Sequence, residues 1–461
     1  MPYVSSFNTW EYSALDNSRW EDIVAVAVEA LSWMELEGLS ERQAFFRAVD
    51  QLEVKNSRSL RMALLIAVET TRRLNMINHL LHSVVPGSLI EQFDLGQRNL
   101  LRAFVYWTVI RGQGKDLLPF IEGARRALGW EATHQLELFF GKISTIKQHR
   151  AEDLPDDRKI AFDTFNQPWF IQYCIRTFGR SMALNYLKST LKPPPAYIRM
   201  NPLVRQENSR SKLEAEGVFL EPIDQLENVF RVLHARRPIT QTESYKAGVV
   251  HIQDKSSCLS TAIAGISEDQ NILDLCSAPG GKTSHMAQLM CNRGEIVSVD
   301  YSIRRMNTWK KTVERLGVEC ANPIIADGQR ELPLTRKFDL VMLDPPCTST
   351  GSLGKIPSAK WRLTREYLQQ MHRIQERLLE TASQQVAIDG YIVYSTCSVT
   401  LDENELTVRD FLRRHPEFSL VTQEPFIGSK GLLGLEQCQR LFQHRNECNG
   451  YFIAKLRRTS E

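Results

Sequence analysis

Apolar residues in the first third of the chain recur every three to four positions, which is the spacing of one face of a helix. The pattern runs through residues 20–34, 60–68, 76–81 and 100–110. Such stripes belong to helices that bury one face against their neighbours. We therefore predict that residues 1–150 form an all-helical domain whose apolar stripes are its core.

The helical pattern stops between residues 147 and 164, where polar residues and a Pro-Asp pair indicate a linker. Two further helices are predicted over residues 169–178 and 182–191. The prolines of LKPPPAY then break the chain before a strand-like segment, YIRMNPLV. We interpret residues 165–245 as a small α+β region.

From about residue 248 the pattern changes to short apolar runs separated by helical segments. The runs are NILDLCS, GEIVSVD, ANPIIAD, FDLVMLD and GYIVYSTC, and each ends in Asp, Ser or Cys. Strands that alternate with helices predict a parallel sheet flanked by helices, so residues 246–461 are expected to form a Rossmann-like α/β domain. In such sheets the ligand crevice lies outside the carboxyl ends of the strands, where these polar residues collect.

Composition narrows the class of protein. The chain has 461 residues and a formal net charge of +3, so several domains are expected and no global field attracts nucleic acid. No apolar stretch is long enough to predict a membrane span, and the first residues do not resemble a signal peptide. Nine cysteines without a CxxC pair indicate reduced thiols in a cytoplasmic protein that has no structural zinc site.

A glycine pair, Gly280 and Gly281, follows the first strand of the α/β domain and precedes a helix. Small residues there let the backbone approach a ligand closely. A phosphate-binding loop is one interpretation of GGKTS, but that motif needs a glycine where Cys276 stands, and the dinucleotide fingerprint GxGxxG is absent. Asp300, about twenty residues on, suits a ribose diol. Asp327, which ends the third strand, can accept a hydrogen bond from an adenine amino group.

Cys347 and Cys397 end the fourth and fifth strands, in DPPCTSTG and YSTCSVTLDENE. We expect these strands to be neighbours, so that both thiols face one crevice. Thr400 and Glu403 have the spacing of a capping box, which predicts a helix start there, and a nearby helix N-terminus lowers the pKa of a thiol. Four other cysteines are interpreted as buried small hydrophobes: Cys174, Cys258, Cys291 and Cys320.

Thiols at this place predict one kind of methyl transfer. Carbon 5 of a pyrimidine is a poor nucleophile until a thiolate adds at carbon 6 and makes an enamine, whose carbon 5 can attack a methyl sulfonium. Amino-group methylation needs no such step, and it often uses Asn or Asp, Pro, Pro and an aromatic residue where this chain has Cys347 in the fourth place. From the chemistry alone, either thiol could be the nucleophile.

Together these motifs resemble the Sun family of RNA cytosine-5 methyltransferases. The resemblance rests on DLCSAPGGKTSH, DPPCTSTG, the KWR at residues 360–362, YSTCSVTLDENE, VVHIQDKSS and the closing GYFIAKL, and it covers roughly residue 165 to the end. It implies that Cys397 is the nucleophile, that Cys347 assists release of the product, and that Asp344 serves both catalysis and cofactor binding. The residues it implies for binding S-adenosylmethionine or the target base are Cys276, Ser277, Ala278, Pro279, Gly280, Gly281, Lys282, Asp300, Arg305, Asp327 and Asp344.

The resemblance also implies partners. Residues 165–245 would be a small RNA-binding subdomain, and the helices of residues 1–150 resemble the NusB-like RNA-binding domain of bacterial members that modify small-subunit ribosomal RNA. We expect a cytoplasmic monomer that acts on RNA, with ribosomal RNA favoured over transfer RNA, and that uses no metal. Several basic residues precede the α/β domain, and by themselves they would be interpreted as a solvated charged face. In an RNA-modifying protein they become candidates for phosphate contacts: Arg199, Arg205, Arg210, Lys212, Arg231, Arg236 and Arg237.

Three other functions compete with this interpretation. A P-loop NTPase is disfavoured by Cys276, and a catalytically silent RNA-binding or assembly factor has no use for two thiols at strand ends. A DNA cytosine-5 methyltransferase places its nucleophile in a Pro-Cys on the fourth strand, which is the position of Cys347. The target base must be exposed or extruded before a thiolate can reach it, so single-stranded or loop RNA is the expected substrate.

Overall fold

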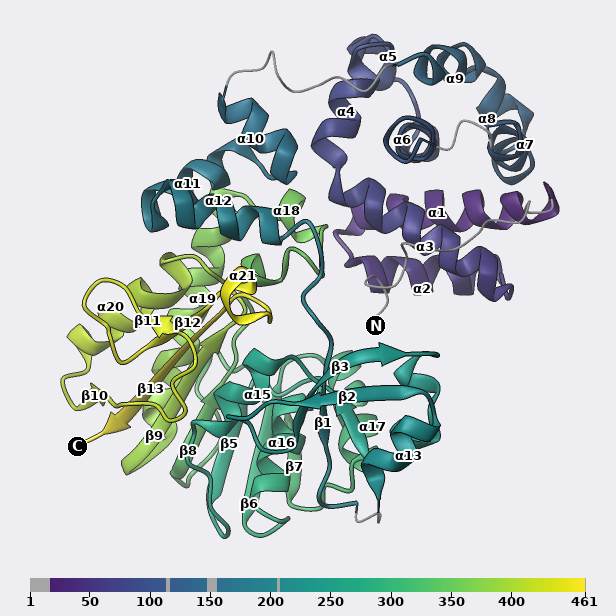
Figure 1. Ribbon diagram of the computed structural model, residues 1–461. Helices are drawn as coiled ribbons and strands as arrows, with labels where there is room; N and C mark the ends of the chain where they lie inside the picture. Colours follow the sequence, from purple (N-terminus) through teal and green to yellow (C-terminus); the bar gives the residue numbers. More distant parts are fainter. Residues whose placement is uncertain (1–16, 113–116, 147–155, 205–207, 461) are drawn as a thin grey trace. The chain divides into compact units, whose positions relative to one another are not determined.

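The structure is a computed structural model, and it describes residues 17–112, 117–146, 156–204 and 208–460 (Figure 1). These residues form two compact units. The helical unit comprises the described residues up to 192 together with Leu353–Arg362. The α/β unit comprises Pro193–Ser352 and the described residues from Leu363 onward. No helix in the described ranges is long and apolar enough to cross a membrane.

The helical unit confirms the prediction of a helical N-terminal region, and its core is built from the predicted apolar stripes. Trp20, Trp107 and Phe104 are fully buried in one cluster, and side-chain caps at Asn56 and Asp94 start two of the helices. Its helices are α1 Asn17–Glu37, α2 Glu41–Leu52, α3 Ser57–Arg72, α4 Leu74–His82, α5 Gly87–Ile90, α6 Leu95–Val105, the π-helix η1 Tyr106–Ile110, α7 Leu117–Leu128, α8 Trp130–His134, α9 Glu137–Ser144, α10 Asp156–Thr164, α11 Pro168–Phe178, α12 Arg180–Ser189 and α18 Ala359–Arg362.

Two segments differ from the predicted organisation. Residues 156–164, expected within a linker, form helix α10, whereas residues 147–155 lie outside the described ranges. Residues 165–245 are divided between the units: α11 and α12 pack with the N-terminal helices, and the strands that follow pack with the α/β unit. The division falls at residues 192 and 193, where the three prolines separate helix from strand.

The KWR motif lies in the helical unit, although the chain around it belongs to the α/β unit. The ammonium of Lys360 donates to the carbonyl of Thr164 at 3.2 Å, and the indole of Trp361 donates to the carbonyl of Thr71 at 2.5 Å. Burial holds the pKa of Lys360 well below its ordinary value, because the low-dielectric surroundings disfavour its charge. This motif is therefore a packing element of the helical unit.

The α/β unit contains a large sheet in the order β11-β12-β13-β9-β8-β5-β6-β7. Strands β7, β6, β5, β8 and β9 pair in parallel, as the alternating pattern predicts. The sheet is not wholly parallel, however, because β13 returns beside β9 in the antiparallel direction and carries β10 and β12 with it. A mixed sheet of this kind is still Rossmann-like, since the parallel strands form its centre.

Helices cover both faces of this sheet (Figure 1). Leu378 of α19 and Phe411 of α20 pack with one side of the strands, and Leu259 of α15 and Met286 of α16 pack with the other. The elements are α15 Lys255–Ala262, β5 Asn271–Leu275, α16 Gly281–Leu289, β6 Glu295–Asp300, α17 Ile303–Arg315, β7 Ala321–Ile325, β8 Phe338–Leu343, η5 Thr350–Ser352, α19 Arg365–Gln385, β9 Val386–Thr396, the π-helix η6 Asp402–Leu406, α20 Thr407–Arg414, β10 Phe418–Leu420, β11 Ser429–Lys430, β12 Gln439–Leu441, α21 Gln443–Asn446 and β13 Tyr451–Arg458.

A second, four-stranded sheet precedes it and has the order β2-β3-β1-β4, with each pair antiparallel. The elements are β1 Tyr197–Met200, α13 Ser209–Ala215, β2 Val218–Pro222, β3 Val229–Ala235, η4 Ile239–Gln241, α14 Glu243–Lys246 and β4 Val250–Ile252. Arg199, predicted to belong to a basic surface, is instead fully buried on β1, where its guanidinium donates to the hydroxyl of Ser284 at 2.9 Å. Arg205 lies outside the described ranges.

Candidate active site

The loop between β5 and α16 is held by main-chain hydrogen bonds to the neighbouring strand. The amides of Cys276 and Ser277 both donate to the carbonyl of Val299, at 2.9 and 3.0 Å. Gly280 has a φ of +97°, and a Cβ there would lie 3.2 Å from the Trp309 ring. Only glycine adopts this backbone without strain. The loop therefore turns directly at the carboxyl ends of β5 and β6, where a parallel sheet binds its ligand.

Asp300 and Arg305 belong to the same network. Asp300 ends β6 and is buried; its Oδ2 atom accepts from the amide of Ala278 at 3.3 Å and pairs with Arg305 at 3.0 Å. Its Oδ1 atom accepts from the amide of Ser302 at 3.0 Å. Arg305 also donates to the carbonyl of Ala278. The structure thus brings together the glycine loop and these two residues, all predicted from the sequence as cofactor residues.

Asp327 lies two residues beyond β7 and is more exposed. Its carboxylate accepts from the amide of Gln329 at 3.1 Å and lies 3.5 Å from Arg330, so it stabilises a turn at the strand end. Asp300, Asp327 and Asp344 stand at or just beyond the carboxyl ends of β6, β7 and β8, three strands of the parallel centre of the sheet. Carboxylates in this arrangement can accept from the hydroxyl, amino and ammonium groups of S-adenosylmethionine, so the residues present fit that cofactor.

The buried side chain of Lys282 forms an ion pair with the partly exposed Asp344. The Lys282 Nζ atom lies 2.5 Å from Asp344 Oδ2, and the Tyr451 hydroxyl lies 3.3 Å from Asp344 Oδ1. Burial alone would lower the pKa of Lys282, but Asp344 and then Tyr451 outweigh it and raise the pKa, so the ammonium is charged at neutral pH. A P-loop lysine must reach a phosphate, whereas this one is already paired. The geometry therefore agrees with the exclusion based on Cys276.

Asp274 lies on β5 beneath this loop and is completely buried. Its Oδ2 atom accepts from the hydroxyl of Thr283 at 2.5 Å, and that hydroxyl accepts from the Trp309 indole at 2.9 Å. Burial raises the pKa of Asp274 to about 7, although the bond from Thr283 opposes the shift. The carboxyl is therefore protonated in mildly acidic solution, unlike an exposed aspartate.

We expect the stability of the protein to fall between about pH 4 and pH 7 partly because of Asp274. Its pKa rises from 3.8 to about 7 on folding, so in this window only the folded state holds the proton, and the free energy of unfolding decreases as pH rises. Asp274→Asn should flatten this dependence, whereas Asp269→Asn, at an exposed neighbouring position, should not. Thermal unfolding across the window measures it; identical slopes in Asp274→Asn and wild type would contradict the expectation.

Cys347 and Cys397 face each other at the ends of β8 and β9. The two strands are parallel neighbours, as predicted, and the Sγ atoms are 3.0 Å apart. Ser349 Oγ lies 3.6 Å from Cys397 Sγ. The thiols of the fourth and fifth strand ends therefore do converge, with Asp344 three residues before Cys347 on the same strand end.

The two thiols differ in acidity. The hydrogen bond between them is the largest cause for both: it lowers the pKa of Cys397 and, with burial, raises the pKa of Cys347 well above its ordinary value. Ser349 also lowers the pKa of Cys397, whereas burial, Asp344 and Glu403 oppose the shift. These opposite shifts favour Cys397 as the thiol that ionises first, with Cys347 as its hydrogen-bond donor.

Gly351 makes the close packing around the thiols possible. Its amide donates to the carbonyl of Cys397 at 2.9 Å, and its carbonyl accepts from the amide of Gly450 at 2.7 Å. A Cβ on Gly351 would lie 1.8 Å from the Gly450 carbonyl oxygen, a contact that no side chain can occupy. The segment after Cys347 therefore reaches Cys397 and the start of β13 only because this residue is glycine.

Residues 262–457 match the family model described as 16S rRNA methyltransferase RsmB/F. The matched region is less than half of the chain. The matched range contains the glycine loop, the three strand-end aspartates and both cysteines.

Named relatives of the RsmB/F region act on RNA. The chain is 33% identical over 300 residues to the 28S rRNA (cytosine(4447)-C(5))-methyltransferase of Homo sapiens, covering 61% of this chain and 37% of that protein. It is 27% identical over 361 residues to the probable ribosomal RNA small subunit methyltransferase B of Bacillus subtilis (strain 168), covering 76% and 75%. The chain spans 37 to 56% of the length of four curated RNA cytosine-C(5) methyltransferases that it matches at 32 or 33% identity.

Solved structures share the fold. The crystal structure of PH0851 covers 97% of this chain and 100% of its own, with a TM-score of 0.84 at 24% identity. The structure of NSun6 from Pyrococcus horikoshii with SFG covers 63% of this chain and 98% of its own, with a TM-score of 0.58 at 24% identity. These likenesses show the fold alone, including that of the helical region.

Some residues of this candidate site were missed or misjudged from the sequence. A helix does follow Cys397, as predicted: it begins with π-helix η6 and continues as α20. Glu403 is not part of a capping box, however, because its carboxylate accepts from the Thr400 hydroxyl and from other neighbours. The lowered pKa of Cys397 comes first from Cys347, not from a helix N-terminus. The signal for the missed residues was the run Glu403-Asn404-Glu405, three polar residues that begin six positions after Cys397.

The other cysteines mostly agree with the prediction of buried small hydrophobes. Cys174, Cys258 and Cys320 are buried, but Cys291 is exposed just after α16, where the chain turns before β6. An exposed position makes the hydrophobic interpretation wrong for that residue. It also makes Cys291 a useful control thiol, since it lies outside the predicted site.

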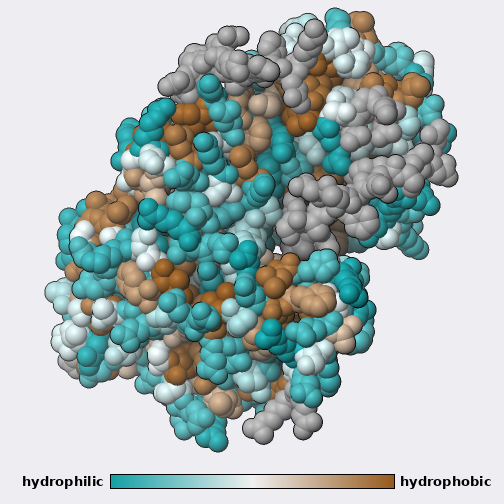
Figure 2. Space-filling model, viewed as in Figure 1, coloured by the Kyte–Doolittle hydropathy of each residue, from teal (hydrophilic) through white to brown (hydrophobic). Residues whose placement is uncertain are grey.

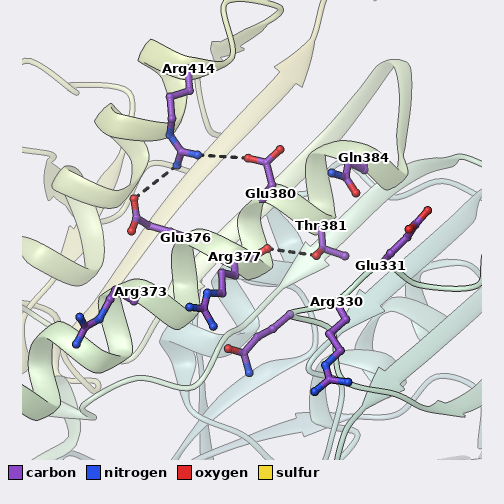
Figure 3. A pocket seen from close by; sticks show the side chains of 10 residues that line it. Arg330, Glu331, Arg373, Glu376, Arg377, Glu380, Thr381, Gln384 and Arg414 are labelled. Atoms are coloured by element: carbon purple, nitrogen blue, oxygen red, sulfur yellow. Dashed lines mark hydrogen bonds and ion pairs between the residues drawn. The ribbon is translucent and has the colours of Figure 1, made fainter.

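A groove of about 730 Å³ in the α/β unit contains none of the predicted site residues (Figure 3). Arg414 lies across it from Glu376 and Glu380 and pairs with both, at 3.6 and 3.4 Å. The groove is lined by Gln329, Arg330, Glu331, Arg373, Glu376, Arg377, Glu380, Thr381, Gln384 and Arg414. This lining contains neither Cys347 nor Cys397, so the groove is distinct from the site predicted from the sequence.

Proposed function

We propose that this protein is an S-adenosylmethionine-dependent methyltransferase that methylates carbon 5 of cytosine in RNA. The observation that carries the proposal is the Cys347–Cys397 pair, two thiols of unequal acidity at neighbouring strand ends. The RsmB/F family model and relatives named as RNA cytosine-C(5) methyltransferases support the same reaction. Bound in the crevice beside the glycine loop, S-adenosylmethionine would supply an electrophilic methyl group.

In this reaction Cys397 adds to the base. Its thiolate sulfur forms a bond to carbon 6 of the cytosine, and the electron pair of the carbon 5–carbon 6 double bond becomes available at carbon 5 for attack on the methyl group. A base must then remove the proton of carbon 5, so that the Cys397 sulfur can leave with its electron pair and restore the ring. Cys347, whose sulfur lies 3.0 Å from that of Cys397, could take up this proton only as a thiolate, after its own proton has passed to solvent.

Lys282, Asp344 and the glycine loop would prepare the site. Asp344 is anchored by Lys282 at 2.5 Å and is partly exposed, so one carboxylate oxygen can accept from the cytosine amino group or from the cofactor. Asp300 and Arg305 would hold the cofactor side of the crevice through the network with Ala278. Each of these groups is fixed by the fold before any ligand binds, which is what positioning a reactant requires.

The four-stranded sheet carries a surface suited to RNA. Phe219 on β2 is exposed, His234 of β3 stacks on it at 6.2 Å between ring centroids, and the guanidinium of Arg236 lies 5.8 Å from the Phe219 ring. Exposed aromatic rings with nearby arginine bind unstacked bases. We propose that this sheet contacts the RNA next to the target cytosine. The helical unit is proposed as a second RNA-binding region, on its NusB-like pattern.

The wider setting is proposed on the same basis. The face of the molecule in Figure 2 shows hydrophobic residues in separate patches among hydrophilic ones. The formal net charge is only +3, so RNA contacts would be local, not global. All nine cysteines are free, and the reaction needs reduced thiols, so we place the protein in the reducing cytoplasm. We propose that it works as a monomer on ribosomal RNA.

The test is methylation of defined substrates. Purified protein and radiolabelled S-adenosylmethionine are incubated with ribosomal RNA, transfer RNA or single-stranded DNA, and cellular RNA from strains with and without the protein is compared by bisulfite sequencing. We expect label in ribosomal RNA and one or a few cytosines protected from conversion only when the protein is present. Transfer of label to DNA alone, or no protected cytosine in any RNA, would overturn the proposal.

A further inference from the structure

The buried carboxylate of Glu403 joins the two loops that carry the thiols. Its Oε1 atom accepts from the amide of Thr348 at 2.8 Å, and its Oε2 atom accepts from the hydroxyls of Thr348 and Ser398, each at 2.5 Å. Thr348 directly follows Cys347, and Ser398 directly follows Cys397. One side chain therefore holds both residues that determine where the thiols stand.

Two further side chains donate hydrogen bonds to the Glu403 carboxylate. The side-chain amide of Gln375, on α19, donates to Oε1 at 3.0 Å and also to the carbonyl of Pro346 at 2.9 Å. The hydroxyl of Thr400 donates to Oε2 at 2.9 Å. Glu403 itself has no solvent exposure. All five of these donors are neutral, so the carboxylate is satisfied by hydrogen bonds alone, an arrangement that is costly to bury and that holds its donors in defined places.

The neighbours of Glu403 on η6 anchor other parts of the same site. Asn404 donates to the carbonyl of Ser398 at 3.0 Å and accepts from the hydroxyl of Thr396 at 2.6 Å. Glu405 pairs with the fully buried Arg440 of β12. Because consecutive residues of a helix point in different directions, η6 connects the two cysteine loops and β12 from one short segment.

We propose that Glu403 is a positioning residue, whose carboxylate clamps Thr348 and Ser398 and thereby keeps the thiols of Cys347 and Cys397 in hydrogen-bond contact. The catalytic meaning of that contact rests on the proposed function. The clamp itself is a property of the two loops and can be tested without RNA or cofactor.

The charge of Glu403 and its clamping position predict opposite effects on the reactivity of Cys397 when Glu403 is replaced. One experiment can therefore decide which of the two matters. The negative charge of Glu403 raises the pKa of both thiols, so removing only the charge would make Cys397 more acidic and more reactive. Removing the clamp would instead separate the thiols, withdraw the hydrogen bond that Cys347 donates, and make Cys397 less reactive at neutral pH.

The experiment measures alkylation of Cys397 by iodoacetamide as a function of pH, with peptide mass spectrometry identifying the modified thiol. We expect Glu403→Gln to slow the alkylation of Cys397 about tenfold at neutral pH and to shift its midpoint to higher pH. Faster alkylation would show that only the charge matters and would overturn the inference. Cys291 in the same sample reports the intrinsic reactivity of an exposed thiol.

Matched threonine variants separate the clamp from general loss of packing. Thr348→Val and Thr400→Val each remove one hydroxyl donor to Glu403, but only Thr348 reaches it from the other thiol's loop. We expect Thr348→Val to slow alkylation several-fold more than Thr400→Val, and Thr348→Ser to restore the wild-type rate. These variants decide the question even where Glu403→Gln does not fold. Equal effects of the two valine variants would overturn the inference, whatever the outcome of the methylation assays.

Discussion

Replacing Cys397 with alanine is expected to abolish methyl transfer. Without a thiolate to add at carbon 6, carbon 5 of the base stays a poor nucleophile, and loss of a covalent nucleophile lowers the rate by about 10³-fold or more. Cys347 lowers the pKa of Cys397, whereas its own pKa is raised. Cys347 therefore cannot replace Cys397 as the nucleophile without first losing a proton that it holds tightly. Single-turnover transfer from radiolabelled S-adenosylmethionine to RNA measures the loss.

Cys347→Ala should give a different result, namely a trapped protein–RNA adduct. If Cys347 exchanges the proton that allows Cys397 to leave, its removal permits addition and methylation but slows release. The adduct should survive denaturing electrophoresis as a band of reduced mobility that contains RNA label. Cys347→Ala also removes the donor to Cys397, so the alkylation of Cys397 should shift to higher pH.

Cys291→Ala is the matched control for both variants, because it removes an exposed thiol outside the site. It should methylate RNA at the wild-type rate and form no lasting adduct. The reverse pattern, with an adduct in Cys397→Ala and no turnover in Cys347→Ala, would exchange the two roles and match the arrangement of DNA cytosine-5 methyltransferases.

The second large effect is expected at the Lys282–Asp344 pair. Asp344→Asn leaves the buried ammonium of Lys282 without its partner, and an unpaired buried charge is strongly destabilising. The side chain of Asp344 is 36% exposed, so solvent screens part of the loss, and the free energy of unfolding should fall by roughly 1–3 kcal/mol. Methyl transfer should fall as well, since Asp344 is the proposed contact to base or cofactor. Urea unfolding and initial rates measure the two effects.

A double-variant cycle tests whether the two residues act as a pair. Lys282→Met combined with Asp344→Asn removes both charges, so the double variant should be more stable than the sum of the two single losses predicts. The free energy of unfolding should recover while methyl transfer does not, because the reaction still lacks the carboxylate. Strictly additive losses of stability would mean that the ion pair contributes nothing to folding.

Local chemistry explains why much of this site could be predicted from the sequence. Cys347, Cys397 and Asp344 each follow an apolar run, and the carboxyl ends of neighbouring parallel strands meet at one edge of a sheet. The strand pattern alone therefore predicts that these residues converge. The same reasoning placed Gly280 and Asp300 at that edge, and it excluded a phosphate loop at Cys276.

The pattern failed where the deciding contact comes from a segment distant in sequence. Arg199 was predicted to be a surface charge, but it lies on β1, is buried, and donates to Ser284 of α16. The KWR residues 360–362 lie between two elements of the α/β unit, but they pack among the N-terminal helices. Charge and spacing describe one segment at a time, whereas burial depends on what covers that segment.

The sequence by itself thus determined which residues stand at the strand ends, including the two thiols with which the chemistry begins. Only the tertiary structure decided how those thiols differ. Their sulfur atoms come within 3.0 Å because Glu403 holds both loops and Gly351 permits their approach. A difference in acidity arises from that contact and its surroundings, and neither is a property of a cysteine's place in the chain.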